Sequence, residues 1–569
     1  MKRQIDFHEV ENISSLKELI LRSSKLYKNN PVFLVKDEKG GEYREITFGK
    51  FQDDINAVGT YLCAKGLRDE KVAIIGENCY HWFLTYYGVV NGTGICVPLD
   101  KELNKNEVQN LIERAGVKAV FLTETYKDFF EGLKFDLKVQ MDPYQKKENK
   151  EEDTLYFQDI LEEGHKRIKE GDSTFIEAVI DPHKANMILY TSGTTGKAKG
   201  VMLSHYNIVS NILDGSRMVR LKEFDRTLSV LPIHHTFEST MGTGLPLYYG
   251  ASIAICEGLK YIAKNMLESK ATILVGVPLI FESIHSKIWK QAEKTGKADA
   301  LRKAISINKK AKRLKLDLKK VLFKSIYSKF GGKLRMIVSG AAPIDPIVVR
   351  GFEDLGIRAL QGYGLTECSP LVTGTPDFTN TYEKPGSVGV CNYTGELKII
   401  NQDDQGVGEI IFKGPNVMLG YYEMEQETAE VLKEGWFYTG DLGYLDDDGW
   451  LYITGRKKNV IVTKTGKNIY PEEVEHYING HKYIQESLVY GVDVEDKDTT
   501  VGAQVRPDYE VIYEEFGENV DEKQIYDLIK KAISDINDKL PIYKRVRNFT
   551  LRKEEFIKTT TKKIIRHKN

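Results

Sequence analysis

The stretch Tyr190–Gly200, YTSGTTGKAKG, constrains the fold more than any other part of the chain. It holds three glycines, four Ser or Thr hydroxyls and two lysines. The apolar run Met187–Leu189 precedes it, and Ser204 beyond it is suited to cap a helix that begins near His205. Glycine lets backbone amides approach an anion, while hydroxyls and lysines donate to its oxygens. The stretch therefore predicts a phosphate-binding loop that leaves a strand and leads towards a helix.

Two common phosphate-loop patterns do not fit this stretch. The pattern G-x-x-x-x-G-K-[ST] needs a hydroxyl after its lysine, whereas Ala198 follows Lys197. No G-x-G-x-x-G opens a helix here either. A flexible linker is the remaining alternative, but linkers seldom follow an apolar strand with so many ordered donors.

Short apolar runs alternate with helical segments through most of the chain and predict α/β layers with parallel strands. Buried strands are expected at Lys71–Ile75, Leu228–Leu231, Ala251–Ile255, Thr272–Val275, Leu334–Val338 and Ile357–Leu360. After Thr375, shorter strands with glycine turns predict a β-rich subdomain over about 376–456. We therefore expect a large N-terminal domain, 1–456, with two α/β layered subdomains and the β-rich one. A mobile α+β domain is expected over 457–569.

Charge and apolar patterning narrow the class of protein. A net charge of −1 gives no general attraction to nucleic acid. Cys79–Leu99 lacks charged residues, but a helix over His81–Val90 and a strand over Gly94–Pro98 explain this run better than a membrane span. The N-terminus has no apolar signal core, and six scattered cysteines indicate reduced thiols, so we expect a cytoplasmic protein.

Two further stretches follow predicted strands. Ser339–Pro343, SGAAP, leaves room for a flat ligand above the sheet, although a plain strand-to-helix turn explains it equally well. In Gln361–Glu367, QGYGLTE, Tyr363 stands between two glycines and offers a ring face on which a purine can stack. Thr366 can donate to a phosphate, and Glu367 is a hard oxygen ligand suited to Mg²⁺.

Together these stretches resemble the signatures of the adenylate-forming superfamily: acyl-CoA synthetases, adenylation domains of peptide synthetases and beetle luciferases. The string LPIHHTFE, Leu231–Glu238, looks most like the long-chain acyl-CoA synthetase branch. The likeness covers about Tyr43 to Arg566. The chain departs from the family at Ala198, where members commonly have Pro, and at Lys562, where they usually have Gly.

The resemblance implies specific roles for matching residues. It places nucleotide contacts at Thr191, Ser192, Gly193, Thr194, Thr195, Gly196, Lys199, Gly340, Ala341, Ala342, Gln361, Gly362, Tyr363, Gly364, Thr366, Asp441, Arg456 and Lys563. It makes Glu367 the Mg²⁺ ligand, Lys458 the hinge, and Thr194, Lys199, His235 and Lys563 the catalytic residues, with His235 lining the acyl and thiol passage. Whether Lys562 or Lys563 enters the site stays open.

A strongly basic insertion spans residues 287–335, with 17 Lys and Arg against 3 Asp and Glu. Leu314, Leu318, Leu322 and Ile326 recur every four residues and predict an amphipathic basic helix. It is either a solvated face or a surface that docks on an anionic membrane or an acidic carrier protein.

The expected reaction joins a medium- or long-chain fatty acid to AMP from ATP with Mg²⁺, then passes the acyl group to coenzyme A. Gly242 and Gly244 are expected to leave room for the acyl chain. Three alternatives stay open: an acyl carrier protein as thiol acceptor, a luciferase-like oxidative enzyme, and a nucleotide-binding regulator without catalysis.

Overall fold

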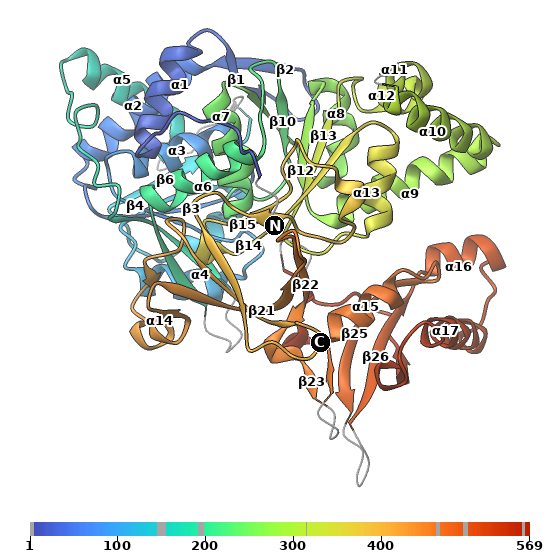
Figure 1. Cartoon of the computed structure of the whole chain (residues 1–569). Coiled ribbons are helices and arrows are strands. Elements are labelled where there is room, and N and C mark those ends of the chain that lie inside the picture. Colours follow the sequence, from blue (N-terminus) through green and yellow to red (C-terminus); the bar gives the residue numbers. More distant parts are fainter. Residues whose placement is uncertain are drawn as a thin grey trace. The chain divides into compact units, whose positions relative to one another are not determined.

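Two large sheets form the framework of the first part of the chain (Figure 1). The computed structural model describes residues 5–144, 155–191, 198–314, 316–462, 467–492, 499–559 and 564–569. The chain divides into two compact units, Arg3–Glu396 with Lys413–Gly435, and Leu397–Phe412 with Trp436–Asn569. Each unit is described by itself.

The eight-stranded sheet of the first unit carries the ends of the predicted phosphate loop. Its order is β19 (Gly420–Tyr421), β9 (Lys199–Ser204), β8 (Ala185–Thr191), β4 (Ile95–Pro98), β3 (Lys71–Ile75), β5 (Ala119–Thr123), β6 (Leu137–Met141) and β7 (Leu155–Tyr156). The strands from β8 to β7 pair in parallel, whereas β9 pairs antiparallel with β8 and with β19. The loop therefore joins a β-hairpin, and a strand that the sequence reading omitted stands between the loop and the next helix.

The nine-stranded sheet carries the other predicted stretches. Its order is β16 (Val390–Cys391), β15 (Leu371–Gly374), β14 (Arg358–Gly364), β13 (Met336–Ser339), β12 (Ile273–Gly276), β10 (Arg226–Ser229), β11 (Ser252–Ile255), β1 (Pro31–Lys36) and β2 (Tyr43–Thr47). From β1 to β14 neighbouring strands are parallel, so their carboxyl ends share one edge of the sheet. Ser339 pairs with Gln361 at that edge, which brings the two following stretches together.

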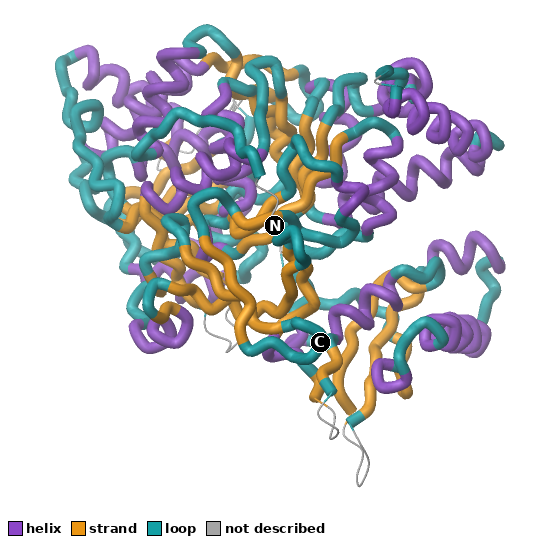
Figure 2. The backbone as a smooth tube through the Cα atoms, in the orientation of Figure 1, coloured by secondary structure: helices purple, strands orange, loops and turns teal. Residues whose placement is uncertain are grey.

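Helices cover both sheets (Figure 2). Those of the first unit are α1 (Leu16–Leu26), α2 (Phe48–Ala64), α3 (Tyr80–Val90), α4 (Lys105–Ala115), α5 (Phe157–Lys169), α6 (His205–Met218), the π-helix η2 (Phe237–Gly244), α7 (Leu245–Tyr249), α8 (Ile262–Ser269), α9 (Pro278–Lys294), α10 (Ala298–Arg313), α11 (Lys319–Leu322), α12 (Lys324–Lys329), α13 (Pro346–Asp354) and α14 (Glu425–Val431). Ser204 caps α6 as predicted: its side-chain oxygen accepts a hydrogen bond from the Asn207 amide, and the Ser204 amide donates to the side-chain oxygen of Asn207.

The uncharged run near residue 80 is a buried helix and strand, as predicted. All eleven residues of α3 are buried against neighbouring elements, and β4 follows at Ile95–Pro98. In the part of the chain that the structure describes, no helix has both the length and the apolar content needed to cross a bilayer.

The basic insertion differs from its prediction. The residues from Leu314 to Ile326 do not form one amphipathic helix, because α10 ends at Arg313 and two short helices follow. The amides of Leu314 and Leu316 both donate to the carbonyl of Ala311, which closes α10. Leu322 and Ile326 pack against the core, but Leu314 is 72% exposed.

The second unit combines a small β structure with an α+β tail. Its strands include β17 (Glu396–Ile400), β18 (Gly408–Lys413), β21 (Trp436–Leu445), β22 (Leu451–Arg456), β25 (Ile484–Val492), β26 (Thr500–Pro507) and β27 (Val546–Leu551). The helices α15 (Pro471–Asn479) and α17 (Glu522–Asn537) pack with the last three strands around one apolar cluster. These elements give residues 457–569 the α+β character expected from the sequence.

Candidate active site

The two ends of the phosphate loop are held opposite each other by the β8–β9 hairpin. Thr191 pairs with Lys199, and the Thr191 hydroxyl donates to the Lys199 carbonyl at 3.4 Å. Five predicted contacts of the loop lie outside the described residues, as does the adjacent Lys197: Ser192, Gly193, Thr194, Thr195 and Gly196. The hairpin therefore brings the two described ends of the loop together within one sheet.

The SGAAP and QGYGLTE stretches meet at the carboxyl edge of the nine-stranded sheet. Gly340, Ala341 and Ala342 follow β13, whereas Gln361, Gly362, Tyr363 and Gly364 are the last residues of β14. Ala341 has a φ of 70°, a left-handed conformation that non-glycine residues seldom adopt.

Close backbone packing explains two of the glycines at this edge. A Cβ on Gly340 would lie 2.9 Å from the Phe237 ring, and one on Gly364 would lie 2.0 Å from the carbonyl oxygen of Pro370. Tyr363 pairs with Thr373 of the antiparallel strand β15, which fixes its backbone. The strand ends therefore leave the Tyr363 backbone little freedom.

The predicted metal ligand Glu367 has a partner that sequence reasoning missed. Glu367 lies in the 3₁₀ turn η4 (Thr366–Cys368), and the hydroxyl of Tyr421 donates to its carboxylate at 2.9 Å. The Glu367 carbonyl also accepts the amide of Met418 at 2.8 Å. Tyr421 belongs to β19, so the pairing of β19 with β9 brings this phenol to the carboxylate.

Tyr421 also contacts the end of the phosphate loop. The ammonium of Lys199 lies 4.7 Å from the centroid of the Tyr421 ring. One tyrosine therefore contacts a predicted phosphate ligand through its ring face and the predicted metal ligand through its hydroxyl. No sequence pattern identified Tyr421, because it lies in a two-residue strand, which is too short to show a periodic signal.

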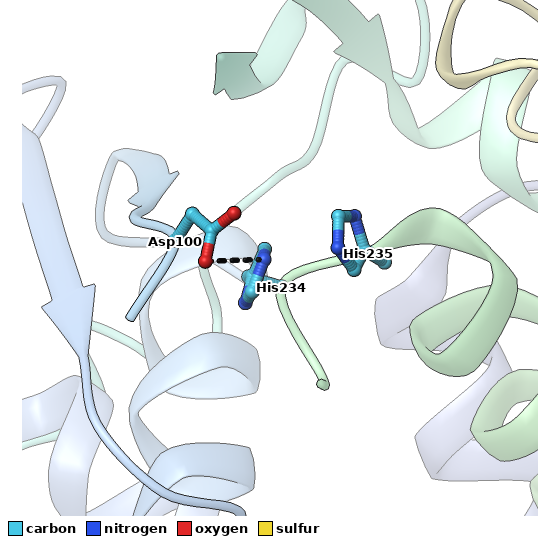
Figure 3. A group of neighbouring side chains, drawn as sticks. All are labelled: Asp100, His234 and His235. Atoms are coloured by element: carbon cyan, nitrogen blue, oxygen red, sulfur yellow. Dashed lines mark ion pairs between the residues drawn. The ribbon is translucent and has the colours of Figure 1, made fainter. Parts of the chain in front are cut away.

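His234 and His235 stand at the end of β10 beside a carboxylate from the other sheet (Figure 3). Asp100, which follows β4, places Oδ1 3.6 Å from Nε2 of the buried His234. The rings of the two histidines have centroids 4.1 Å apart. One ligand atom from each of the three residues lies within 4.8 Å of the others, a spacing that could hold a metal ion.

Charge in this cluster is set by burial and by the neighbouring rings. Burial disfavours the Asp100 carboxylate, but hydrogen bonding and attraction from His234 outweigh it and lower the Asp100 pKa to about 2. Burial and repulsion from His234 lower the pKa of His235 to about 3. His235 is therefore neutral near pH 7, and it is a weak base.

The π-helix after the histidines is packed more tightly than predicted. A Cβ on Gly242 would lie 2.9 Å from the Glu238 carboxyl group, and one on Gly244 would lie 2.5 Å from the Ile212 side chain. The expectation that these glycines leave room for an acyl chain is wrong, because neighbouring side chains occupy that space. Burial raises the pKa of Glu238 to about 8.

The remaining predicted residues belong to the second unit. Asp441 of β21 pairs with Arg456 of β22, and Nε of Arg456 lies 2.7 Å from Oδ1 of Asp441. Lys458, the predicted hinge, lies in the next turn, η6 (Lys457–Asn459). Burial lowers the pKa of Lys458, and the charges of Arg456 and Arg566 lower it further.

Lys562 and Lys563 lie outside the described residues, but the chain on both sides of them is described. Lys558 forms a β-bridge with Ile564, and its ammonium lies 2.5 Å from Oε2 of Glu486. Arg566 donates to Glu475 at 2.6 Å and to the Val489 carbonyl at 2.7 Å. The segments that flank the terminal lysines are therefore held against the tail.

Comparison with known proteins gives consistent matches along the chain. The family model described as AMP-binding enzyme matches residues 22–422, and the model described as AMP-binding enzyme C-terminal domain matches residues 458–569. Fatty acyl-CoA synthetase B of Dictyostelium discoideum is 27% identical, over 94% of this chain and 83% of that protein. The long-chain-fatty-acid–CoA ligase of Bacillus subtilis is 28% identical, over 81% of each.

Solved structures share the fold. The anthranilate CoA ligase AuaEII in complex with anthranoyl-AMP superposes with a TM-score of 0.75 at 21% identity, over 99% of this chain and 96% of that one. ATP-bound MatB from Rhodopseudomonas palustris gives 0.73 at 24% identity, over 97% of each chain. These likenesses confirm the expected α/β fold class.

Proposed function

The chain belongs to the AMP-binding enzyme family, and from that premise we propose that it is a fatty acyl-CoA synthetase. It joins a fatty acid to the α-phosphate of ATP, releasing pyrophosphate, and then transfers the acyl group to coenzyme A, releasing AMP. The curated relatives named as long-chain acyl-CoA synthetases or ligases, 25–29% identical over most of the chain, support this reaction.

The structural observation that carries the proposal is the grouping at the end of β14. Tyr363 lies at the end of β14 and Thr366 and Glu367 directly follow that strand. Tyr421 connects Glu367 to Lys199 beside the predicted phosphate loop. The residues that we assign to the purine, a phosphate, the metal ion and a cationic contact therefore all belong to the first unit.

The first half-reaction concentrates negative charge on phosphate oxygens. The fatty carboxylate attacks the α-phosphorus and forms a new P–O bond, while the bond to the pyrophosphate oxygen breaks. This step needs placed donors and cations more than a strong base, and one such donor typically contributes about 2.7–4 kcal/mol. We assign this role to the loop hydroxyls Thr191, Thr194 and Thr195, to Lys199 and Thr366, and to Lys563.

Magnesium fits this arrangement because carboxylate oxygen is its preferred protein ligand. Glu367 would hold the ion, and the hydroxyl of Tyr421 keeps the Glu367 carboxylate in a fixed orientation. When bound, the ion supplies positive charge that offsets the phosphate oxygens. Asp441 is assigned to the ribose hydroxyls and Arg456 to the ribose or a phosphate, as the family resemblance implies.

In the second half-reaction a thiol sulfur attacks the acyl carbon and the AMP oxygen leaves. Because the pKa of His235 is lowered to about 3, His235 is suited to lining the passage rather than to removing the thiol proton. Lys458 is assigned to the hinge at which the tail begins. We propose coenzyme A rather than acyl carrier protein as acceptor, since the curated relatives are named as CoA ligases.

All six cysteines are free, which agrees with the reduced thiols expected from the sequence. On this basis we propose a cytoplasmic location.

A pyrophosphate-release screen over fatty acids of graded chain length tests the proposed reaction. We expect release that needs both a fatty acid and Mg²⁺, with acyl-CoA formed when coenzyme A is present. Product assays with coenzyme A and acyl carrier protein side by side identify the acceptor. Oxygen consumption from the adenylate would favour a luciferase-like enzyme, and absence of release with every acid would favour a regulator.

Half-reaction assays test the terminal lysines. Lys563→Ala is expected to slow adenylation about 10²–10³-fold while sparing thioester formation from supplied acyl-adenylate. Lys562→Ala is the matched control. A larger loss in the Lys562 variant would transfer the role to that residue, and equal loss in both halves would remove Lys563 from the adenylation step.

A further inference from the structure

We propose that the basic insertion, residues 287–335, docks the protein on the surface of a lipid bilayer that contains anionic headgroups. The proposal concerns a surface outside the nucleotide site. It can be tested without any substrate, so it stands independently of the proposed reaction.

The insertion concentrates positive charge that the rest of the chain lacks. Its 17 basic and 3 acidic residues give an excess of 14 positive charges within 49 residues. The whole chain has a net charge of −1, so the other 520 residues carry 15 more acidic than basic side chains. Solubility does not require basic and acidic side chains to lie in separate segments of the chain. A basic segment on an otherwise acidic protein therefore indicates a more specific role.

The structure places these charges outward. The inner residues Leu301, Ala304 and Ile305 of α10 pack against the core of the nine-stranded sheet. The anchor of α10 is Asn308, which donates to the carbonyl of Asp354 at the end of α13. Figure 1 shows α9 to α12 gathered at one edge of the first unit. The opposite faces of these helices are therefore available to a partner.

Most of the exposed lysines of the insertion form no ion pair with a described carboxylate. Lys309 pairs with Asp354, and Lys319 pairs with Asp317. Among the described residues, no ion pair links a carboxylate to the exposed lysines at 287, 290, 294, 297, 303, 310, 320, 324, 329 and 333. The ammonium groups of these lysines therefore remain accessible to an anionic partner.

Exposed branched side chains lie among these lysines. Leu314 is 72% exposed, Leu316 54%, Val321 77% and Ile307 49%, and all four lie on α10, α11 or the turn between them. Apolar side chains that stand beside lysines match a bilayer interface, where the side chains enter the acyl boundary and the ammonium groups remain at the headgroups.

The extent of the surface favours a bilayer over an acidic carrier protein. The helices α9 and α10 have 17 and 16 residues, so each is about 25 Å long. Unpaired lysines occur along both of them and continue into α12. A small acidic protein contacts a compact patch, whereas a charged membrane presents a plane that can engage the whole length.

Vesicle sedimentation of the full chain tests the proposal. The probe is phosphatidylcholine vesicles with and without phosphatidylglycerol, an anionic lipid that gives the surface a negative potential. We expect binding to the anionic vesicles only, and its loss at high salt. Each lysine near such a surface contributes about fivefold to the partition constant, so the quadruple variant Lys303→Glu, Lys310→Glu, Lys320→Glu and Lys324→Glu should lose at least 100-fold.

A matched variant changes four exposed lysines of another surface in the same first unit, Lys105→Glu, Lys118→Glu, Lys134→Glu and Lys138→Glu. It should retain binding within about threefold, because these lysines lie outside the basic insertion. A second pair, Leu314→Ser with Val321→Ser, keeps every charge and should weaken binding about tenfold through lost apolar insertion. Circular dichroism and the thermal midpoint establish that each variant is folded.

Three results would overturn the proposal. Equal binding to neutral and anionic vesicles would show that the charge of the headgroups does not contribute to binding. Equal loss of vesicle binding in both quadruple variants would show that binding depends on the net charge of the protein and not on this surface. No vesicle binding, together with retention on immobilised acyl carrier protein that the insertion variant abolishes, would assign the surface to an acidic protein instead.

Discussion

The hydroxyl of Tyr421 donates a 2.9 Å hydrogen bond to Glu367 from a strand more than fifty residues further along the chain. The bond depends on the pairing of β19 with β9 in the eight-stranded sheet. It therefore connects the carboxylate at the end of β14 to the sheet that holds the phosphate loop. Tyr421 is best described as a positioning residue, since it acts through Glu367.

Tyr421→Phe should weaken the response to magnesium. Loss of a hydrogen bond to a charged group costs about 1.5–3 kcal/mol, which corresponds to roughly 10–100-fold. We expect the Mg²⁺ concentration for half-maximal pyrophosphate release to rise by about tenfold or more, with the rate at saturating Mg²⁺ changed less than about threefold. Tyr422→Phe is the control, and an unchanged magnesium dependence in Tyr421→Phe would contradict the positioning role.

Gly364→Ala should displace the end of β14. The added Cβ would lie 2.0 Å from the Pro370 carbonyl oxygen, which is backbone and cannot rotate away. We expect nucleotide affinity to fall about tenfold or more, with a lower thermal midpoint, because overpacking costs about 1–3 kcal/mol. Gly480→Ala, whose Cβ would meet no atom closer than 3.4 Å, should change neither quantity appreciably. Titration with ATP measures the affinity.

Asp441→Asn tests the ribose contact. Asparagine keeps the shape but accepts hydrogen bonds without a negative charge, so KM for ATP should rise about 10–100-fold. Asp441 is buried, but Arg456 is 34% exposed, so water can still solvate the guanidinium when the carboxylate becomes an amide. The thermal midpoint should therefore move only slightly. The exposed turn residue Asp447 supplies the control Asp447→Asn, and an equal KM for ATP in both variants would argue against a ribose role.

Stability should fall in mild acid because of His205. The imidazole Nδ1 accepts the amide of Leu16 and Nε2 donates to the carbonyl of Val90, an arrangement that only the neutral ring can make. Burial lowers the pKa of His205 to about 4. Its contribution is therefore present above pH 6.5 and is lost as the pH falls towards 4, by up to about 3 kcal/mol.

Denaturant unfolding at pH 7.5, 6 and 5 measures this effect. His205→Gln should be less stable than the parent at pH 7.5 but lose less stability on acidification. The exposed His183 provides the control His183→Gln, which should follow the parent curve. Parallel curves for His205→Gln and the parent would show that His205 does not titrate in this range.

Local chemistry allowed much of the fold to be predicted. The cap at Ser204 set the start of α6, and apolar runs located β3, β10, β11, β12 and β13 to within two residues. The hairpin strand β9 was missed because its apolar residues directly follow the glycine-rich loop. The single helix predicted across Leu314–Ile326 was wrong, since a four-residue repeat cannot reveal that the amides of Leu314 and Leu316 close the preceding helix.

The side chains that contact the site residues could not be predicted from the sequence, for a different reason. Asp100 meets His234 across two sheets, and Tyr421 meets Glu367 through a two-residue strand. Neither pair shares a local pattern, because each depends on which strands become neighbours. The tight packing of Gly242 against Glu238 was equally hidden, since a glycine alone does not tell whether the space beside it is empty or filled.

The separation of basic from acidic side chains affects the protein before it contacts a negative surface. With a cluster of lysines on α9 to α12 and a surplus of carboxylates elsewhere, the molecule is an electric dipole. In the field outside a negative interface, a dipole turns until its positive end leads. The protein would then approach the membrane in one orientation rather than in random ones. The association rate would decline with added salt, because ions screen the field over shorter distances.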